Sequence, residues 1–83
     1  MYKGRLVLST AGHDKGVVLC VLRQDGEFVY LADGRKRKVQ KPKRKKLKHV
    51  ELISETAYSG PVTNKAIYAF IRDAKALVQV AIN

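Results

Sequence analysis

Short apolar runs separated by turn signals occupy the first 53 residues of the chain. Residues 6–8 and 17–22 are continuous apolar runs of strand length, and residues 27–32 are rich in aromatic and β-branched side chains. The dipeptides at 25–26 and 33–34 are both Asp-Gly, which is typical of tight hairpin turns. The pattern therefore predicts an antiparallel meander with strands at 17–22, 27–32 and 35–39.

Two further strands extend this meander. Residues 6–8 precede a glycine-flanked loop at 12–16, and residues 47–53 alternate well enough to form a fifth strand. Five short strands crossed by turn signals predict a mainly β fold, folded as a small closed or nearly closed antiparallel barrel.

The pattern changes after Ile53. Residues 54–62 contain Gly60-Pro61 and are typical of a linker, and helical spacing begins at Thr63, the expected N-cap. The apolar stripe consists of Ile67, Phe70, Ile71, Ala74, Leu77 and Val78. Residues 77–82 are compatible with either a longer helix or a strand. The predicted organisation is a barrel at 1–53, a linker at 54–62 and a C-terminal α-helical tail at 63–83.

The stripe of this tail must be buried somewhere, because an isolated helix of about 15 residues is marginal in water. It packs either on its own barrel or on a second copy of the chain. We favour a monomer over a homodimer.

The positive charge is concentrated in one segment. The chain carries 17 Lys and Arg against 7 Asp and Glu, for a net charge of +10. Ten of the basic residues lie within 14 positions, uninterrupted by an acid: Arg35, Lys36, Arg37, Lys38, Lys41, Lys43, Arg44, Lys45, Lys46 and Lys48. Such a block repels itself and favours a polyanionic partner, although most charge runs are simply solvated faces.

The basic segment is expected in two parts. Residues 35–38 are predicted on a strand with charges on both faces, which indicates an edge strand that projects away from the core. Residues 41–46 are predicted as an extended basic loop that Pro42 restrains. The charges of this loop are expected to neutralise phosphates and to hold no core.

The loop from Gly12 to Gly16 is a second candidate site. Its glycines permit left-handed backbone, its amides can face an anion, Lys15 adds a charge, and the ring of His13 can stack on a base. The plainer alternative is an ordinary strand connection in which Asp14 caps its own turn.

These segments together resemble the KOW motif. The resemblance rests on the glycine loop with Asp14 and Lys15, the apolar strand after it, Ala32-Asp33-Gly34, Lys38, Lys41-Pro42-Lys43 and Lys48-His49, and it covers roughly residues 4–52. The chain is similar to the small stand-alone KOW-domain RNA-binding proteins of bacteria, which are related to KOW-containing large-subunit ribosomal proteins of archaea and eukaryotes. His13 and Val17 depart from the basic residues that many relatives have there.

The resemblance implies an SH3-like five-stranded barrel, structured RNA such as ribosomal RNA as the ligand, a ribosomal or ribosome-associated accessory role, and no catalysis. The expected RNA contacts are His13, Lys15, Arg35, Lys36, Arg37, Lys38, Lys41, Lys43, Arg44, Lys45, Lys46, Lys48 and His49. The residues expected to shape the loop are Gly12, Asp14 and Gly16. We place His49 on a strand surface near the basic loop.

Four aromatic residues are candidates for base stacking: Tyr2, Phe28, Tyr30 and Tyr58. Phe28 and Tyr30 are two residues apart and so share one strand face, which in a thin barrel we expect to be core for at least one of them.

Catalytic chemistry is poorly supported. Cys20 lies within an apolar run, where cysteine is usually an inert small hydrophobe, and His13 and His49 have no nucleophile at a recognisable spacing. One cysteine and two histidines make no familiar zinc site. We expect neither an enzyme nor a cofactor or metal.

The single cysteine suits a reducing compartment, and the first 13 residues lack the apolar core of a signal peptide or membrane span. A cytoplasmic protein without a membrane partner or a small-molecule substrate is expected. Two alternatives to RNA binding stay open, a DNA-binding barrel and a protein-interaction module of the transcription or translation machinery.

Overall fold

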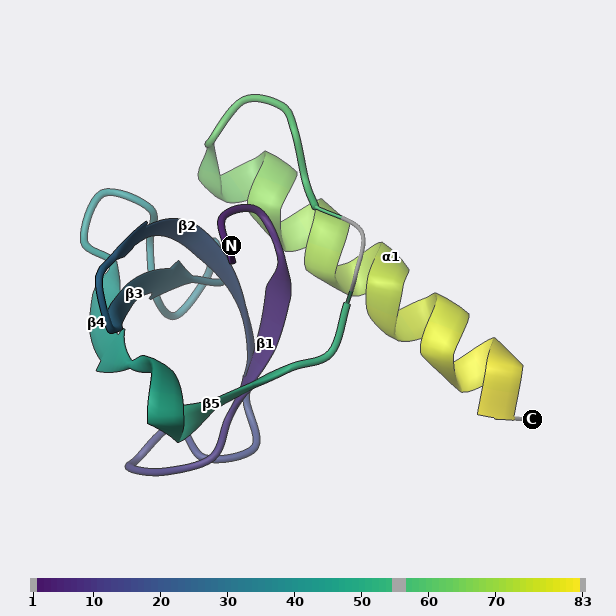
Figure 1. Cartoon of the computed structure of the whole chain (residues 1–83). Helices are drawn as coiled ribbons and strands as arrows, with labels where there is room; N and C mark the ends of the chain where they lie inside the picture. Colours follow the sequence, from purple (N-terminus) through teal and green to yellow (C-terminus); the bar gives the residue numbers. More distant parts are fainter. Residues whose placement is uncertain (1, 55–56, 83) are drawn as a thin grey trace.

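The computed structural model describes the backbone of residues 2–54 and 57–82, and the side chains of these residues up to position 76. It consists of five short strands and one C-terminal helix (Figure 1). The elements are β1 (Leu6–Ser9), β2 (Val18–Asp25), β3 (Phe28–Ala32), β4 (Lys43–Lys46), a 3₁₀ turn (Leu47–His49), β5 (Val50–Leu52) and α1 (Asn64–Ile82).

The strands form one curled antiparallel sheet in the order β4-β3-β2-β1-β5. The 3₁₀ turn connects the two edge strands, β4 and β5, so that the sheet wraps around an interior (Figure 1). The predicted mainly β fold with five antiparallel strands and a C-terminal helix is confirmed. Within the described residues the sheet is open, because β4 and β5 are its edges rather than a pair.

Alternation along the strands fills the interior of the sheet. Val7, Leu19, Val21, Val29 and Leu31 form one buried cluster. Their neighbours on the strands point to the opposite, outer face, as the two-residue period of a strand requires. Four partly buried side chains pack against this cluster: Tyr2, Leu47, Val50 and Leu52.

The helix packs on the outer face of the sheet rather than inside it. Ile67 and Ile71 are buried against Leu6 and Cys20. Thr63 is the N-cap as predicted, because its Oγ1 accepts a hydrogen bond from Ala66 N at 3.1 Å. Of the two arrangements expected for the tail, packing on its own barrel is therefore present. The region 77–82 continues the helix, and the side chains of Leu77 and Val78 lie outside the described residues.

The second half of α1 extends past the sheet (Figure 1). No helix in the described part of the chain is long and apolar enough to cross a membrane.

Cys20 is 1% exposed and packs as a small hydrophobe, as expected. Burial raises the pKa of its thiol to about 11.

The predicted strand at 35–39 is wrong, and so is the predicted loop at 41–46, since β4 comprises Lys43–Lys46. The Asp33 side chain causes the difference. Its Oδ1 accepts hydrogen bonds from the amides of Arg35 and Arg37, both at 2.9 Å, and closes a local loop before any strand begins. The predicted fifth strand is also shorter than expected, because residues 47–49 form the 3₁₀ turn.

Candidate nucleic-acid interface

The segment 33–42 between β3 and β4, here called the basic loop, is firmly docked on the start of the helix. The Asn64 side chain accepts a hydrogen bond from Val39 N at 2.8 Å and donates one to Gln40 Oε1 at 2.9 Å. Gly34 lies against the same helical turn with φ +82°, and a Cβ there would collide with the backbone carbonyl of Asn64. The helix therefore holds the basic loop in place.

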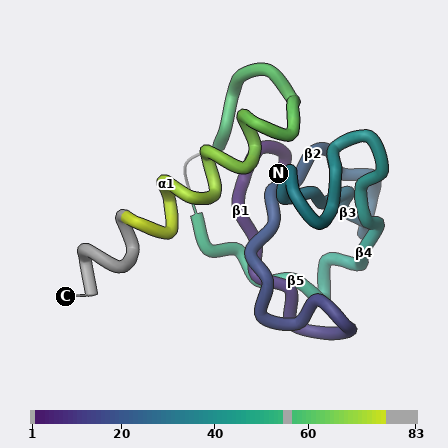
Figure 2. Tube along the Cα trace, turned by 180° about the vertical axis from the view of Figure 1, so that it is seen from behind, coloured from purple at the N-terminus to yellow at the C-terminus, as the bar shows by residue number. Residues whose placement is uncertain are grey.

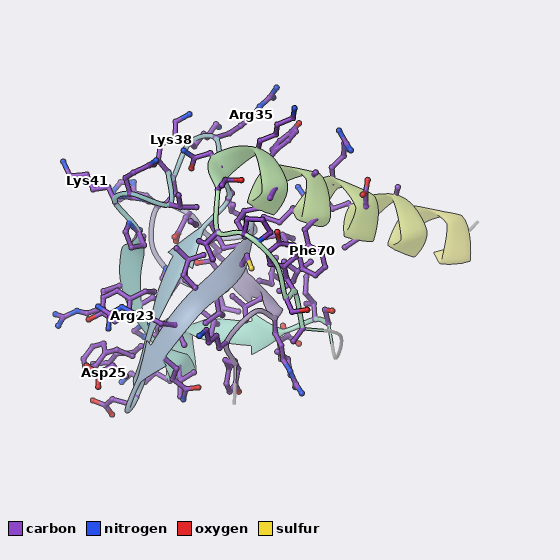
Figure 3. The ribbon with its side chains drawn as sticks, turned by 90° about the horizontal axis from the view of Figure 1, so that it is seen from above. Arg23, Asp25, Arg35, Lys38, Lys41 and Phe70 are labelled. Atoms are coloured by element: carbon purple, nitrogen blue, oxygen red, sulfur yellow. The ribbon has the colours of Figure 1, made fainter. Side chains whose placement is uncertain are left out.

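The basic loop presents its cations to solvent. Arg35, Lys36, Lys38 and Lys41 are exposed and Arg37 is half-buried. Arg35, Lys38 and Lys41 follow one another along one border of the molecule (Figure 3). The Arg35 guanidinium lies over the ring of Tyr68, 4.3 Å from its centroid, so it is oriented by the helix.

Strand β4 divides its four basic residues between two faces. Arg44 and Lys46 point outward and are exposed, whereas Lys43 and Lys45 point to the interior side. Lys45 is 8% exposed, and its Nζ donates to Asp14 Oδ1 and Ala11 O at 2.6 Å and to Ser9 Oγ at 2.8 Å. All three ammonium hydrogens are thereby used.

Lys45, expected as an RNA contact, is therefore buried and engaged within the fold, and the expectation that charges of this segment hold no core is wrong. The sequence pattern suggested a loop, but an edge strand of a small curled sheet must turn one of its faces inward. Lys43 is also partly engaged, since its Nζ forms an ion pair with Asp14 Oδ2 at 3.2 Å without the geometry of a hydrogen bond.

Asp14 is the acceptor that organises this end of the sheet. Burial of the carboxyl raises its pKa, but the hydrogen bonds from Lys45 and Ser9, the contact with Lys43 and the charge of Lys45 outweigh burial. The net effect holds the pKa of Asp14 well below its usual range. Asp14 is thus a partly buried anion that ties the 12–16 loop to β4, a larger role than capping its own turn.

The other eight basic residues of the segment form no ion pair within the described part of the chain. Among the residues that the structure describes, no carboxylate pairs with any of them. They are Arg35, Lys36, Arg37, Lys38, Lys41, Arg44, Lys46 and Lys48.

Phe28 and Tyr30 lie on the outer face of β3, and the expectation that one of them is core is wrong. The interior positions of β3 are taken by Val29 and Leu31, both 0% exposed. Phe28 and Tyr30 are half-buried beneath cationic side chains. Arg23 lies over the ring of Tyr30 at 3.8 Å from its centroid, and Arg44 lies over Phe28 at 4.5 Å.

A bulge explains how Arg23 reaches this face. The pairing of β2 with β3 shifts between Val21 and Arg23, where Leu22 is the extra residue. Without the shift, strict alternation would direct Arg23 inward beside Val21. The bulge instead places it opposite Tyr30. Arg23 could not be identified as a site residue from the sequence, because no turn signal or glycine marks the bulge. The sequence shows only that Arg23 follows an apolar run.

The 12–16 loop has the predicted backbone conformation but lies away from the basic loop. Gly12 and Gly16 have φ of +87° and +88°, which confirms the left-handed conformations. His13 and Lys15 are exposed. The loop is at one end of the sheet and the basic loop at the other (Figures 1 and 2), so the two do not form one continuous site.

Lys48 and His49 belong to the 12–16 end of the molecule. The carbonyl of His49 accepts a hydrogen bond from Thr10 N at 2.9 Å, and both residues are part of the 3₁₀ turn. His49 is expected from the sequence on a strand near the predicted loop at 41–46; it does follow that segment closely, but it lies in the 3₁₀ turn rather than on a strand.

The remaining aromatic candidates for stacking are used by the fold. Tyr2 packs against the interior cluster. Tyr58 contacts Phe70 with ring centroids 5.1 Å apart and donates its hydroxyl hydrogen to Pro61 O at 2.8 Å.

A scan against protein-family models and a search of curated proteins both give no match for this chain.

Proposed function

We propose that this protein binds RNA in the cytoplasm, through the basic loop and the outer side of β4, and that it acts as a ribosomal or ribosome-associated accessory factor rather than an enzyme. The observation that carries the proposal is the set of eight basic residues in one segment that have no carboxylate partner among the described residues. The resemblance of residues 4–52 to the KOW motif supports RNA as the polyanion and ribosomal RNA as its source.

The mechanism is phosphate neutralisation by a preformed loop. Lysines and arginines that contact phosphates release condensed counterions, which drives association. The side-chain oxygens of Asp33 and Asn64 accept hydrogen bonds from backbone amides of the basic loop and so fix its backbone before RNA arrives. Less ordering is then required on binding, which raises the affinity.

The test compares two triple variants of equal charge. In the first variant Lys36, Lys38 and Lys41 of the basic loop are changed to Gln. In the control variant Lys3, Arg72 and Lys75, which are exposed outside the basic loop, are changed to Gln. Binding to a fluorescein-labelled ribosomal RNA fragment is followed by anisotropy at about 100 mM salt. The basic-loop variant should lose about tenfold or more in affinity and the control less than about threefold. Equal losses would mean that net charge, rather than this surface, determines binding.

Two controls separate RNA binding from the alternatives. A DNA oligonucleotide of the same sequence tests the DNA-binding barrel, because recognition of the 2′-hydroxyl distinguishes RNA from DNA. A pull-down from lysate before and after RNase treatment tests the protein-interaction module, whose partner would survive the nuclease.

A further inference from the structure

The outer face of β2, β3 and β4 carries two arginine–aromatic stacks that phosphate binding does not require. We call Arg23, Phe28, Tyr30, Arg44 and Lys46 the arginine–aromatic face. From its geometry we infer that this face stacks the bases of unpaired RNA, so that the ligand is single-stranded or looped RNA rather than a continuous duplex. The inference deepens the proposed function and rests on it.

The strand register places these side chains in two rows across the sheet. Arg23, Tyr30 and Arg44 are cross-strand partners in one row, and Asp25, Phe28 and Lys46 are partners in the next. Arg44 reaches diagonally to Phe28, at 4.5 Å from the ring centroid, and Lys46 Nζ lies 6.0 Å from the same ring. Each of the two aromatic rings therefore lies beneath a guanidinium group.

The helix leaves this part of the outer face open. Ile67 and Ile71 cover the region over Leu6 and Cys20, before the bulge in β2. Beyond the bulge the exposed outward side chains are three cations, Arg23, Arg44 and Lys46, and one acid, Asp25 at the end of β2. A face that served only folding would be expected to be covered or plainly polar, rather than built from stacked aromatic and planar cationic groups.

The guanidinium groups of this face are positioned by aromatic rings. Their central carbons lie 3.8 Å from the Tyr30 centroid and 4.5 Å from the Phe28 centroid, and both arginines are exposed. Within the described chain, no hydrogen bond or ion pair engages the side chain of Arg23 or Arg44, although Asp25 and Glu27 are close in sequence. A base can stack on the free side of a guanidinium plane while its N–H edge donates to phosphate.

Base stacking of this kind selects unpaired nucleotides. In an A-form duplex both faces of an internal base are covered by its neighbours, whereas loops and single strands can splay bases onto aromatic or arginine planes. Such contacts tolerate any base, since every base has a π-face.

The charges around the arginine–aromatic face indicate the path that an RNA strand would take over the surface. Asp25 lies at one end of the labelled border, and Lys41, Lys38 and Arg35 of the basic loop follow Arg23 away from it (Figure 3). Phosphates are repelled at the Asp25 end and attracted at the other. A single strand would therefore run from the arginine–aromatic face onto the basic loop.

The experiment uses the full chain and changes stacking without changing charge. Arg23 and Arg44 are both replaced by Lys, which keeps the cation and removes the planar group. The matched control is Arg72→Lys, an exposed arginine on the helix. Affinity is measured for a single-stranded 12-nucleotide RNA containing 2-aminopurine and for a blunt duplex of the same sequence, and thermal melts verify that each variant is folded.

The wild type should bind the single strand at least about tenfold more tightly than the duplex, with a change in 2-aminopurine fluorescence on binding. The double Arg→Lys variant should lose about tenfold for the single strand, keep its affinity for the duplex within about twofold, and lose the fluorescence change. Phe28→Leu combined with Tyr30→Leu should have the same effect, because it removes the support beneath both arginines.

Equal wild-type affinity for the two RNAs, or equal losses for both in the Arg→Lys variant, would overturn the inference while leaving RNA binding intact. Absence of binding to either RNA would instead overturn the proposed function.

Discussion

Replacement of Lys45 should destabilise the fold far more than replacement of any other residue in the basic segment. Lys45→Met removes the three hydrogen bonds to Ser9, Ala11 and Asp14, which are 2.6 to 2.8 Å long. It also leaves the Asp14 carboxylate, with 17% of its side chain exposed, with the more distant Lys43 as its cationic partner among the described residues and the Ser9 hydroxyl as a hydrogen-bond donor.

Removing one partner of a buried ion pair costs about 3–5 kcal/mol. The native state of a small domain is stable by only about 5–15 kcal/mol. At about 4–8 °C per kcal/mol for a chain of this size, the melting temperature should fall by more than about 12 °C.

Urea unfolding followed by circular dichroism gives the free energy of unfolding for the wild type, Lys45→Met and the exposed control Lys36→Met. The double variant Asp14→Ala with Lys45→Met removes both buried charges and should recover part of the loss, which gives a favourable coupling in the cycle. A Lys45→Met variant as stable as Lys36→Met would refute the structural role of this lysine. The same reasoning predicts that reversing the charges of all four β4 residues unfolds the chain and does not merely abolish binding.

Three further predictions concern stability. Gly34→Ala should lower the melting temperature more than Gly16→Ala, because both glycines are left-handed but only Gly34 meets the helix backbone where a Cβ would lie; equal melts would contradict this contact. The lowered pKa of Asp14 means that its ionised form contributes stability in full above the unfolded pKa of about 3.9 and loses it as the pH falls towards the lower folded value. Melts between pH 2 and 5 should therefore fall more steeply with acid for the wild type than for Asp14→Asn, and parallel curves would count against the buried pair. Removal of the chain from Thr63 onward exposes the sheet surface beneath Ile67 and Ile71. Burial of these two side chains is worth roughly 3–6 kcal/mol, so the shortened chain should have a much lower melting temperature. A melting temperature of the full chain that rises with protein concentration would show that copies share their helices.

Local signals in the sequence predict most of the sheet and the start of the helix. Apolar and β-branched runs bounded by Asp-Gly turns identify β2 and β3, and Thr63 marks the N-cap of the helix. These patterns also give the number of strands and the helix that follows them, but they misplace β4.

The details of the candidate site depend on contacts between distant residues, which composition cannot reveal. Lys45 reads as one of several lysines, and only its pairing opposite Val29 turns it toward Asp14, 31 positions earlier. Arg23 depends on a bulge, and the start of β4 depends on a loop closed by the Asp33 side chain. Each of these is a tertiary or side-chain effect that overrides the local pattern.

The dependence of RNA affinity on salt tests the central claim most directly. About five of the eight unpaired basic residues contacting phosphates of a single strand would give a slope of log K against log salt of about −3.5, and duplex-like RNA about −4.5. A titration of the full chain with a single-stranded ribosomal RNA fragment between about 50 and 300 mM salt should therefore show a steep, linear fall in affinity. A slope near zero would contradict the proposal that this basic segment holds RNA through its phosphates.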